Sequence, residues 1–281
     1  MEPLSSRKRK MYFTVCVLLF VLLCPVVILY SIGYRFDKTL GFVKTGGLYI
    51  NLDLPGAEIY LDSKLVRHTN VLFDSYFLQN LRPKEYFIIV AKEGYYSWAK
   101  RLPIMPEKVT QIEPFLLPKE TPLREIPMQN QEYSQILAFF LKENASELLQ
   151  SEDLIRERVR VKDGEHFLLE GKVAIWQKDN TVYAGWASTL TTIPYFFCTN
   201  EECSGNVKGF TSPSKLVHAD FFPGKNNLVI IAYADGILVS EIDIRHTQNT
   251  EPLYMIPGAD FRVIDDVVYV KDGEKLFEVE L

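Results

Sequence analysis

An unbroken apolar run near the N-terminus constrains this chain more than any other feature. Met11 to Ile32 contains no charged residue, and four basic residues stand directly before it, namely Arg7, Lys8, Arg9 and Lys10. As a helix rising about 1.5 Å per residue, the run is about 33 Å long, enough to cross a hydrocarbon core of about 30 Å. Because Lys and Arg resist translocation, the N-terminus is predicted to be cytoplasmic and the region after Ile32 extracytoplasmic. The sequence therefore predicts a single-pass protein of the cell membrane.

A cleaved signal peptide is the main alternative for this segment. Signal peptides usually have a shorter apolar core and end at a small-residue site. Ser31-Ile32-Gly33 does place small residues at that spacing. A lipoprotein signal fits less well, because leucines precede Cys24 where small residues are expected. A buried soluble helix is disfavoured, since no polar residue marks a solvent face. The retained anchor is the favoured interpretation, and cleavage stays open.

Charge is divided unevenly along the chain. Residues 1–10 carry a net charge of +3, whereas residues 33–281 hold 27 basic and 35 acidic residues, a net charge of −8. Nucleic-acid binding needs a concentrated basic face, so this acidic region argues against it. The basic tail is explained by topology and by contact with anionic lipid head groups. Membrane lipid is therefore an expected partner.

Short apolar segments and abundant aromatic residues predict a mainly β fold after the anchor. The chain contains 15 Tyr and 18 Phe, and turn residues interrupt most apolar runs. The predicted parts are a cytoplasmic tail (1–10), a transmembrane helix (11–32), a juxtamembrane segment (33–45), a small β-sandwich (46–118), a linker (119–133) and a helix followed by a β-repeat region (134–281).

Alternation of apolar and polar residues predicts the strands of the 46–118 region. Ala57 to Asp62 alternates cleanly, as a half-buried strand does. Tyr86 to Lys92 is almost continuously apolar, which predicts a central strand covered on both faces. Tyr95 to Ile104 is expected to return antiparallel with Trp98 in the core, and Val109 to Leu117 to close the sheet. About five short strands of this kind make a β-sandwich.

These segments resemble the PEGA domain, which recurs in envelope and surface proteins of bacteria and archaea. The resemblance rests on Gly47 to Ile50, on Leu54 to Asp62, and on Tyr86 through Gly94 to Trp98. The chain departs from the family pattern where Ser63 replaces a hairpin glycine and where Lys84-Glu85 replaces Pro-Gly. The resemblance implies an immunoglobulin-like or transthyretin-like sandwich in an envelope setting. It implies no catalytic residues.

One helix is predicted beyond the membrane segment, from Ser134 to Leu154. Its apolar residues recur at helical spacing along one side: Ile136, Leu137, Phe140, Leu141, Leu148 and Leu149. Packing of this side against the following sheet is the favoured interpretation. A membrane-surface helix or a partner-binding helix is the alternative.

A strand–turn–strand unit recurs in the distal region. Its copies span Val173–Trp186, Leu228–Ile244 and Val267–Glu280, with turns at Asp179-Asn180, Asp235-Gly236 and Asp272-Gly273. Such turns supply the positive φ that tight hairpins need. Two further segments recur: Val161 to Glu165 as Val270 to Glu274, and Ala219-Asp220-Phe221 as Ala259-Asp260-Phe261.

The spacing of these units resembles the blade period of a β-propeller, which is roughly 40 residues. A closed propeller has at least four blades, and the region barely accommodates them. A small, partial or open propeller-like array is therefore predicted. Chance recurrence of a common turn is the alternative.

Cys198 and Cys203 form the sharpest local pattern. Outside the cytoplasm, two cysteines flanking a polar loop are expected to form a disulfide that clamps a hairpin. A zinc site would need further ligands at a recognisable spacing, and a thioredoxin-like motif has two intervening residues rather than four. Free thiols stay open if the organism exports no oxidising machinery.

No catalytic, cofactor-binding or metal-binding residue is predicted. The histidines His68, His166, His218 and His246 are scattered, and each is interpreted as a surface or capping residue. Nucleophile-elbow, phosphate-loop and H-E-x-x-H motifs are absent from the sequence. Acidic pairs such as Asp265-Asp266 are interpreted as solvated loop residues.

The sequence thus favours a non-catalytic envelope protein that scaffolds, attaches to a surface, or binds an exported protein or a cell-wall glycan. Two alternatives stay open. One is an extracytoplasmic enzyme with residues dispersed among repeat loops, since propellers can host such sites. The other is an accessory subunit of a membrane sensor or transport complex.

Overall fold

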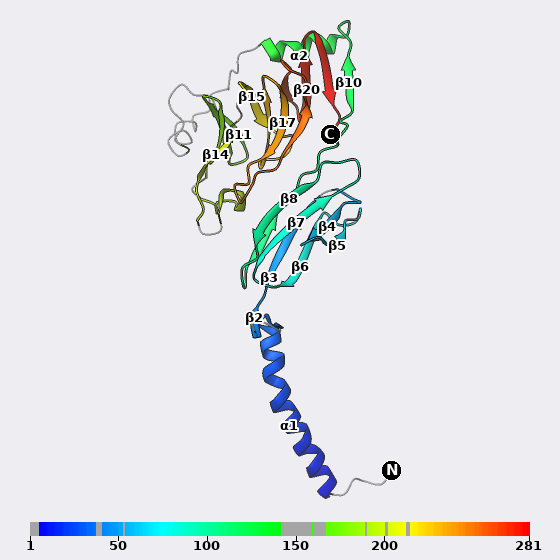
Figure 1. Cartoon of the computed structure of the whole chain (residues 1–281), viewed down its shortest axis with the longest axis vertical. Coiled ribbons are helices and arrows are strands. Elements are labelled where there is room, and N and C mark those ends of the chain that lie inside the picture. Colours follow the sequence, from blue (N-terminus) through cyan, green and yellow to red (C-terminus); the bar gives the residue numbers. More distant parts are fainter. Residues whose placement is uncertain are drawn as a thin grey trace. The chain divides into compact units, whose positions relative to one another are not determined.

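The computed structural model describes residues 6–37, 41–52, 54–141, 159, 167–188, 190–199, 202–211 and 214–281. Helix α1 (Ser6–Ser31) is long and apolar enough to cross a membrane, with a mean hydropathy of 2.9 over its apolar window (Figure 1). It begins five residues before the predicted span, so Arg7 to Lys10 lie exposed in its first turns. Gly33, with φ of 88°, follows the helix and turns the chain into strands.

Two compact units make up the chain, and each is described by itself. The first comprises Met1–Asp53, Leu72–Tyr86 and Leu102–Glu113; the second comprises Leu54–Val71, Phe87–Arg101 and Pro114–Leu281. The division therefore runs through the predicted 46–118 domain rather than through the predicted linker.

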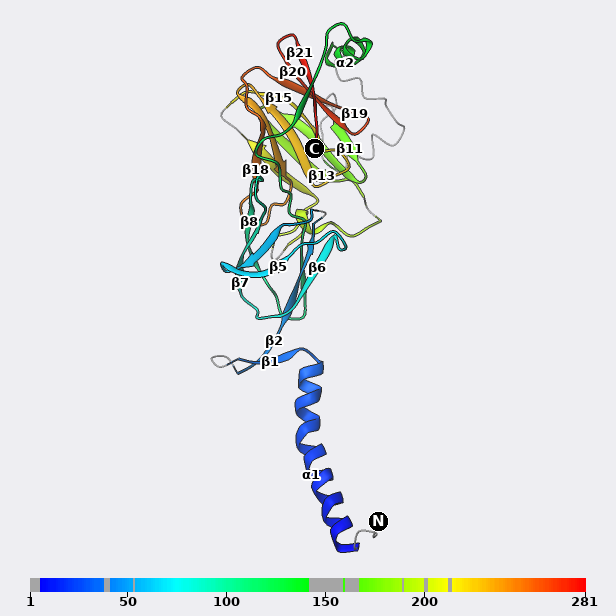
Figure 2. The ribbon, with the colours of Figure 1, turned by 90° about the vertical axis from the view of Figure 1, so that its right-hand side faces the viewer.

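The first unit contains α1, a hairpin and a three-stranded sheet. β1 (Tyr34–Asp37) pairs antiparallel with β2 (Gly41–Lys44) directly after the helix (Figure 2). β3 (Gly46–Asn51) then lies between β6 (Ser75–Leu81) and β9 (Val109–Ile112). β9 is shorter than the predicted closing strand, and it pairs parallel to β3.

A four-stranded sheet opens the second unit. Its strand order is β5-β4-β7-β8, with bounds Lys64–His68, Glu58–Leu61, Glu85–Ala91 and Trp98–Pro103. β7 is central, as predicted, but it alternates between buried and half-exposed residues, so only one of its faces is deeply covered. The β4–β5 turn uses Asp62 and Ser63, both at positive φ, so serine accepts the conformation for which glycine was expected.

Three further four-stranded sheets form the distal part of this unit. β11 (Phe167–Glu170), β12 (Val173–Lys178), β13 (Thr181–Trp186) and β14 (Asn206–Thr211) form one sheet. β15 (Leu216–Phe221), β16 (Leu228–Tyr233), β17 (Gly236–Glu241) and β18 (Thr250–Tyr254) form the next. β19 (Asp260–Ile264), β20 (Val267–Asp272) and β21 (Lys275–Val279) belong to the third, and all its described pairings are antiparallel.

The fourth strand of the third sheet comes from earlier in the chain. β10 (Leu123–Ile126) pairs antiparallel with β21, as the green and red strands in Figure 1 show. The predicted 119–133 linker therefore contains a sheet strand. Each predicted strand–turn–strand unit forms a hairpin, at β12–β13, β16–β17 and β20–β21. The Val161–Glu165 copy of the repeated segment lies outside the described residues, and so does His166, which was interpreted as a surface or capping residue.

The helix of the distal region, α2 (Gln131–Leu141), begins three residues before its predicted start. Its apolar side packs on the third sheet, where Ile136 lies in a buried cluster with Ile126 and Leu276. This confirms sheet packing for the described part of the helix. Residues 142–154 of the predicted helix lie outside the described residues.

Candidate functional site

A small pocket lies among β11, β15 and β19, which are edge strands of the three distal sheets. Its volume is about 160 Å³, and residues of β11, β15 and β19 line it together with the turns that follow β15 and β19. The lining includes three carboxylates, from Glu170, Asp220 and Asp266. Asp265 and Asp266 both have positive φ and form the β19–β20 turn, so the turn itself determines where this acidic pair lies.

Asp220 is the most perturbed group of this pocket. Its carboxylate accepts a hydrogen bond from its neighbour, with Phe221 N 2.7 Å from Asp220 Oδ1. Burial raises the pKa of Asp220 to about 6, and the negative charge of Glu170 adds to the rise, while Arg262 opposes it. The pocket thus presents a carboxyl group that can gain or lose a proton near neutral pH.

The recurring Ala-Asp-Phe segment places a second carboxylate, that of Asp260, on β19. Asp260 occupies on β19 the position that Asp220 occupies on β15, and its Oδ1 likewise accepts from the following amide at 2.8 Å. Asp260 Oδ2 also pairs with Arg262 at 2.8 Å. The guanidinium of Arg262 lies 5.0 Å from the ring centroid of Phe140 on α2. The two equivalent positions of the repeat therefore differ: the Asp260 carboxylate is paired with a guanidinium, whereas the Asp220 carboxyl can take up a proton.

His218 is buried, which corrects its interpretation as a surface or capping residue. Its ring centroid is 5.0 Å from that of Phe261, and its Nε2 has no hydrogen-bond partner among the described residues. Burial lowers the pKa of His218 to about 4, with Arg262 adding to the fall and Asp260 opposing it. Alternation along β15 places His218 on the same side as Asp220, so packing against β19 rather than solvent surrounds it.

Opposite pH dependences are expected from these two buried groups. Folding keeps Asp220 protonated, so its stabilising contribution is lost as pH rises from about 4 to about 6. Folding keeps His218 neutral, so its contribution is lost as pH falls from 6.5 to about 4. Each effect is at most about 3 kcal/mol, and the two oppose each other over the same pH window.

Removing either group should therefore reveal how the free energy of unfolding depends on pH through the other group. We expect Asp220→Asn to be destabilised by acidification from pH 6.5 to 4.5, and His218→Gln to be stabilised by it relative to the parent. Chemical denaturation of the full chain at both pH values, followed by tryptophan fluorescence, measures this. Parallel pH profiles for both variants and the parent would contradict the assignment.

A buried ionic network lies elsewhere in the second unit, and the sequence analysis missed it. The side chain of Lys100 on β8 is fully buried, with its Nζ 2.6 Å from Glu241 and 3.2 Å from Asp243. Asp243 also accepts from Arg245 Nε at 2.9 Å and Nη2 at 2.7 Å, which makes a bidentate pair. Two cations and two carboxylates thus neutralise one another inside the fold.

Neutral groups complete this network. Trp98 Nε1 donates to Glu241 Oε2 at 2.9 Å, while the backbone and side-chain nitrogens of Asn249 both donate to Glu241 Oε1 at 2.8 Å. Ala99 N donates to Asn249 Oδ1 at 3.2 Å. The network therefore joins the four-stranded sheet of β8 to the sheet of β17. Its signals were a lysine on the buried face of an alternating strand, and Glu241, Asp243 and Arg245 at a spacing of two.

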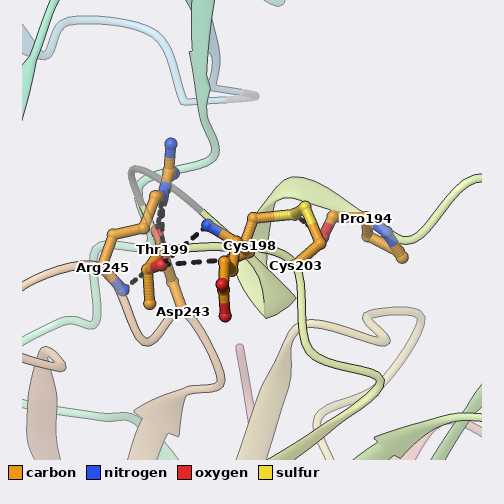
Figure 3. Close-up of a disulfide and its surroundings, with 7 residues drawn as sticks. Pro194, Cys198, Thr199, Cys203, Asp243 and Arg245 are labelled. Carbon is orange, nitrogen blue, oxygen red and sulfur yellow. Dashed lines mark hydrogen bonds and ion pairs between the residues drawn. A yellow bond between two sulfur atoms is a disulfide. The ribbon is translucent and has the colours of Figure 1, made fainter.

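The disulfide of Cys198 and Cys203 lies next to this network (Figure 3). The short helix η1 (Tyr195–Phe197) precedes Cys198, and Arg245 stacks over the Tyr195 ring with its Cζ 4.5 Å from the centroid. Ile244 N donates to Phe196 O at 3.3 Å. The pairing agrees with the predicted clamp, and its oxidation in the cell stays a prediction. The short helix directly before the disulfide thus contacts the cation that holds Asp243.

Metal chemistry has no assembled donor set in the described part of the chain, where no group of three or more His, Cys, Asp or Glu side chains could hold an ion. The pocket can exchange a proton at Asp220 and can form polar contacts through its carboxylates. No family model matches the chain, and no curated protein matches it. The resemblance of residues 46–118 to the PEGA domain accordingly stays a prediction.

Proposed function

We propose that this chain is a membrane-anchored extracytoplasmic protein that holds its distal sheets as a non-catalytic binding platform for an envelope protein or a cell-wall glycan. The apolar helix α1 and the four basic residues at its start support the anchor and its orientation. The acidic composition after residue 32 supports a partner other than nucleic acid.

The buried ionic network is the observation that carries this proposal. Buried charge pairs favour one arrangement of the sheets that they join, because separated partners would be left unpaired in a dry interior. Lys100, Glu241 and Asp243 hold the sheet of β8 and the sheet of β17 together in this way within the second unit, and a fixed arrangement of sheets suits a binding platform.

The finer fold assignments belong to the same proposal. We assign residues 46–118 to a PEGA-like module, supported by the Gly56 turn, the Asp62-Ser63 hairpin and the buried Trp98. We assign the distal sheets to a small propeller-like array, supported by three four-stranded sheets with β10 as the last strand of the third. Loops on rigid sheets are common recognition sites, so the face around the pocket is the proposed contact surface.

Photocrosslinking in intact cells tests the proposed role. A photoreactive residue at Leu169, which lines the pocket and is partly exposed, is expected to capture one discrete envelope component, protein or glycan. The matched control is the same residue at Leu190, which is 94% exposed and lies outside the pocket. Protease added to right-side-out cells should at the same time cut the 33–281 region. Adducts of equal pattern at both positions, or full protection from protease, would refute the proposal.

Catalysis is the second candidate, favoured by one observation. Asp220 combines a pKa raised by burial to about 6 with a neighbouring carboxylate in a pocket, as general acid–base catalysis requires. Turnover of an envelope glycan or ester by the parent chain that disappears in Asp220→Asn, while the variant stays folded, would establish this candidate instead. The pocket is smaller than most ligand sites, which is why binding by the surrounding face is preferred.

A further inference from the structure

The hairpin of β1 and β2 carries two exposed aromatic rings at the end of α1. Phe36 and Phe42 are directly paired across the two strands, with ring centroids 5.5 Å apart in an edge-on arrangement. They are nevertheless 71% and 58% exposed. The contact between two large apolar side chains on one face of a short hairpin stabilises the hairpin only slightly. An exposed apolar face of this kind commonly marks a contact with another molecule or with a membrane.

The base of the hairpin is bonded to the helix end. Arg35 on β1 stacks over the Tyr30 ring at 3.6 Å and donates to the Tyr30 carbonyl at 2.8 Å. That carbonyl belongs to the last turn of α1, whose unpaired acceptors and negative dipole end favour a guanidinium. Thr45 after β2 donates from its backbone and its hydroxyl to Gly33 O, at 3.1 and 3.0 Å. The hairpin thus begins at the level where the apolar helix ends.

Electrostatic attraction does not explain the exposed face. Arg35 also donates to Asn80 at 2.6 Å, and Lys44 forms an ion pair with Glu107 at 2.8 Å. The two cations on the described strands of the hairpin, Arg35 and Lys44, are therefore engaged with protein groups. On the described strands of the hairpin, the two phenyl rings are the large apolar groups that stay mostly exposed.

We propose that the β1–β2 hairpin lies in the outer interface of the bilayer, with Phe36 and Phe42 inserted among lipid head groups and the first methylenes. This inference rests on the proposed membrane anchor. Phe36 follows Ser31 by five residues, so at about 3.3 Å per residue it lies within about 17 Å of the helix end. The region between hydrocarbon core and water falls inside that reach. Aromatic side chains commonly mark this depth in membrane proteins.

Quenching by brominated lipid tests the depth of the hairpin. The full chain is reconstituted in phosphatidylcholine vesicles, with or without lipid brominated near the head-group end of its acyl chains. Phe36→Trp is compared with Leu190→Trp as an exposed control, after subtraction of the parent signal from Trp98, Trp176 and Trp186. We expect the added Phe36→Trp signal to be quenched at least about twofold more than the Leu190→Trp signal, as interfacial residence requires. Phe42→Trp, tested separately, should behave in the same way.

Vesicle composition and flotation separate the possible failures. Quenching should be equal in neutral and anionic vesicles, because the inserted face is apolar and Arg35 and Lys44 are engaged with protein groups. A chain that floats with vesicles but shows no added quenching at either position would overturn this inference and leave the anchor standing. Quenching that appears only with anionic lipid, or that changes with protein-to-lipid ratio because a second copy covers the rings, would also overturn it. A chain that does not float would overturn the anchor and this inference together.

Discussion

Replacing Lys100 with methionine is expected to destabilise the second unit by about 3–5 kcal/mol, because it leaves the buried Glu241 carboxylate without its cation. Glu241 would keep its hydrogen bonds from Trp98 and Asn249 but would lose its only ion pair among the described residues. Urea denaturation of the full chain in detergent micelles, followed by tryptophan fluorescence, measures the loss. Trp98 donates a hydrogen bond to Glu241, so its fluorescence should respond directly when the network is disturbed.

Two further variants show whether charge or packing is responsible. Lys64→Met removes an exposed lysine from β5 and should change the free energy of unfolding by less than about 0.5 kcal/mol. Lys100→Met combined with Glu241→Gln removes both charges of one pair, and should recover more than half of the loss. A double variant as unstable as Lys100→Met alone would assign the effect to lost packing of the lysine stem.

Arginine at both Leu18 and Leu22 is expected to abolish stable membrane insertion. These residues lie near the middle of α1 and are exposed along it. Each arginine at the centre of a membrane helix costs roughly 2.5–3.5 kcal/mol on an insertion scale, so the pair costs about 5–7 kcal/mol. Alkaline carbonate extraction should move the protein from the membrane pellet to the supernatant.

The matched control replaces the same two leucines with alanine. Alanine shortens the side chains without introducing charge, so the helix should stay in the pellet. If the arginine variant also resists carbonate, the helix is held by something other than its own partition into lipid.

Local turn chemistry explains why the distal hairpins could be predicted. A tight hairpin needs positive φ within a few residues, and Asp179, Gly236 and Gly273 have it. At Gly236 an added Cβ would also come within 2.9 Å of the Met255 sulfur, so the position tolerates little else. The membrane helix was predictable for a similar reason, since length and apolar content are properties of one continuous segment.

Long-range partners explain what could not be predicted. Trp98 and Glu241 are 143 residues apart in the sequence, and no pattern in either segment predicts their contact. His218 stands between Val217 and Ala219 in the sequence, and no neighbour there identifies Phe261 on β19 as the ring it packs against. Asp220 was recognised as part of a repeat, but its pKa is raised first by burial and then by the charge of Glu170 on another strand, and neither can be read from the segment itself.

The last distal sheet has a consequence for how this protein is made. β10 is synthesised more than a hundred residues before β21, which is its pairing partner. Until the C-terminal strand emerges, one edge of β10 has no strand to pair with, and unpaired edges invite association with other chains. Biosynthesis therefore contains an interval in which this segment must be shielded, and its length is set by the rate at which residues 127–274 are delivered. A chaperone that shields extended segments with open strand edges would act during that interval.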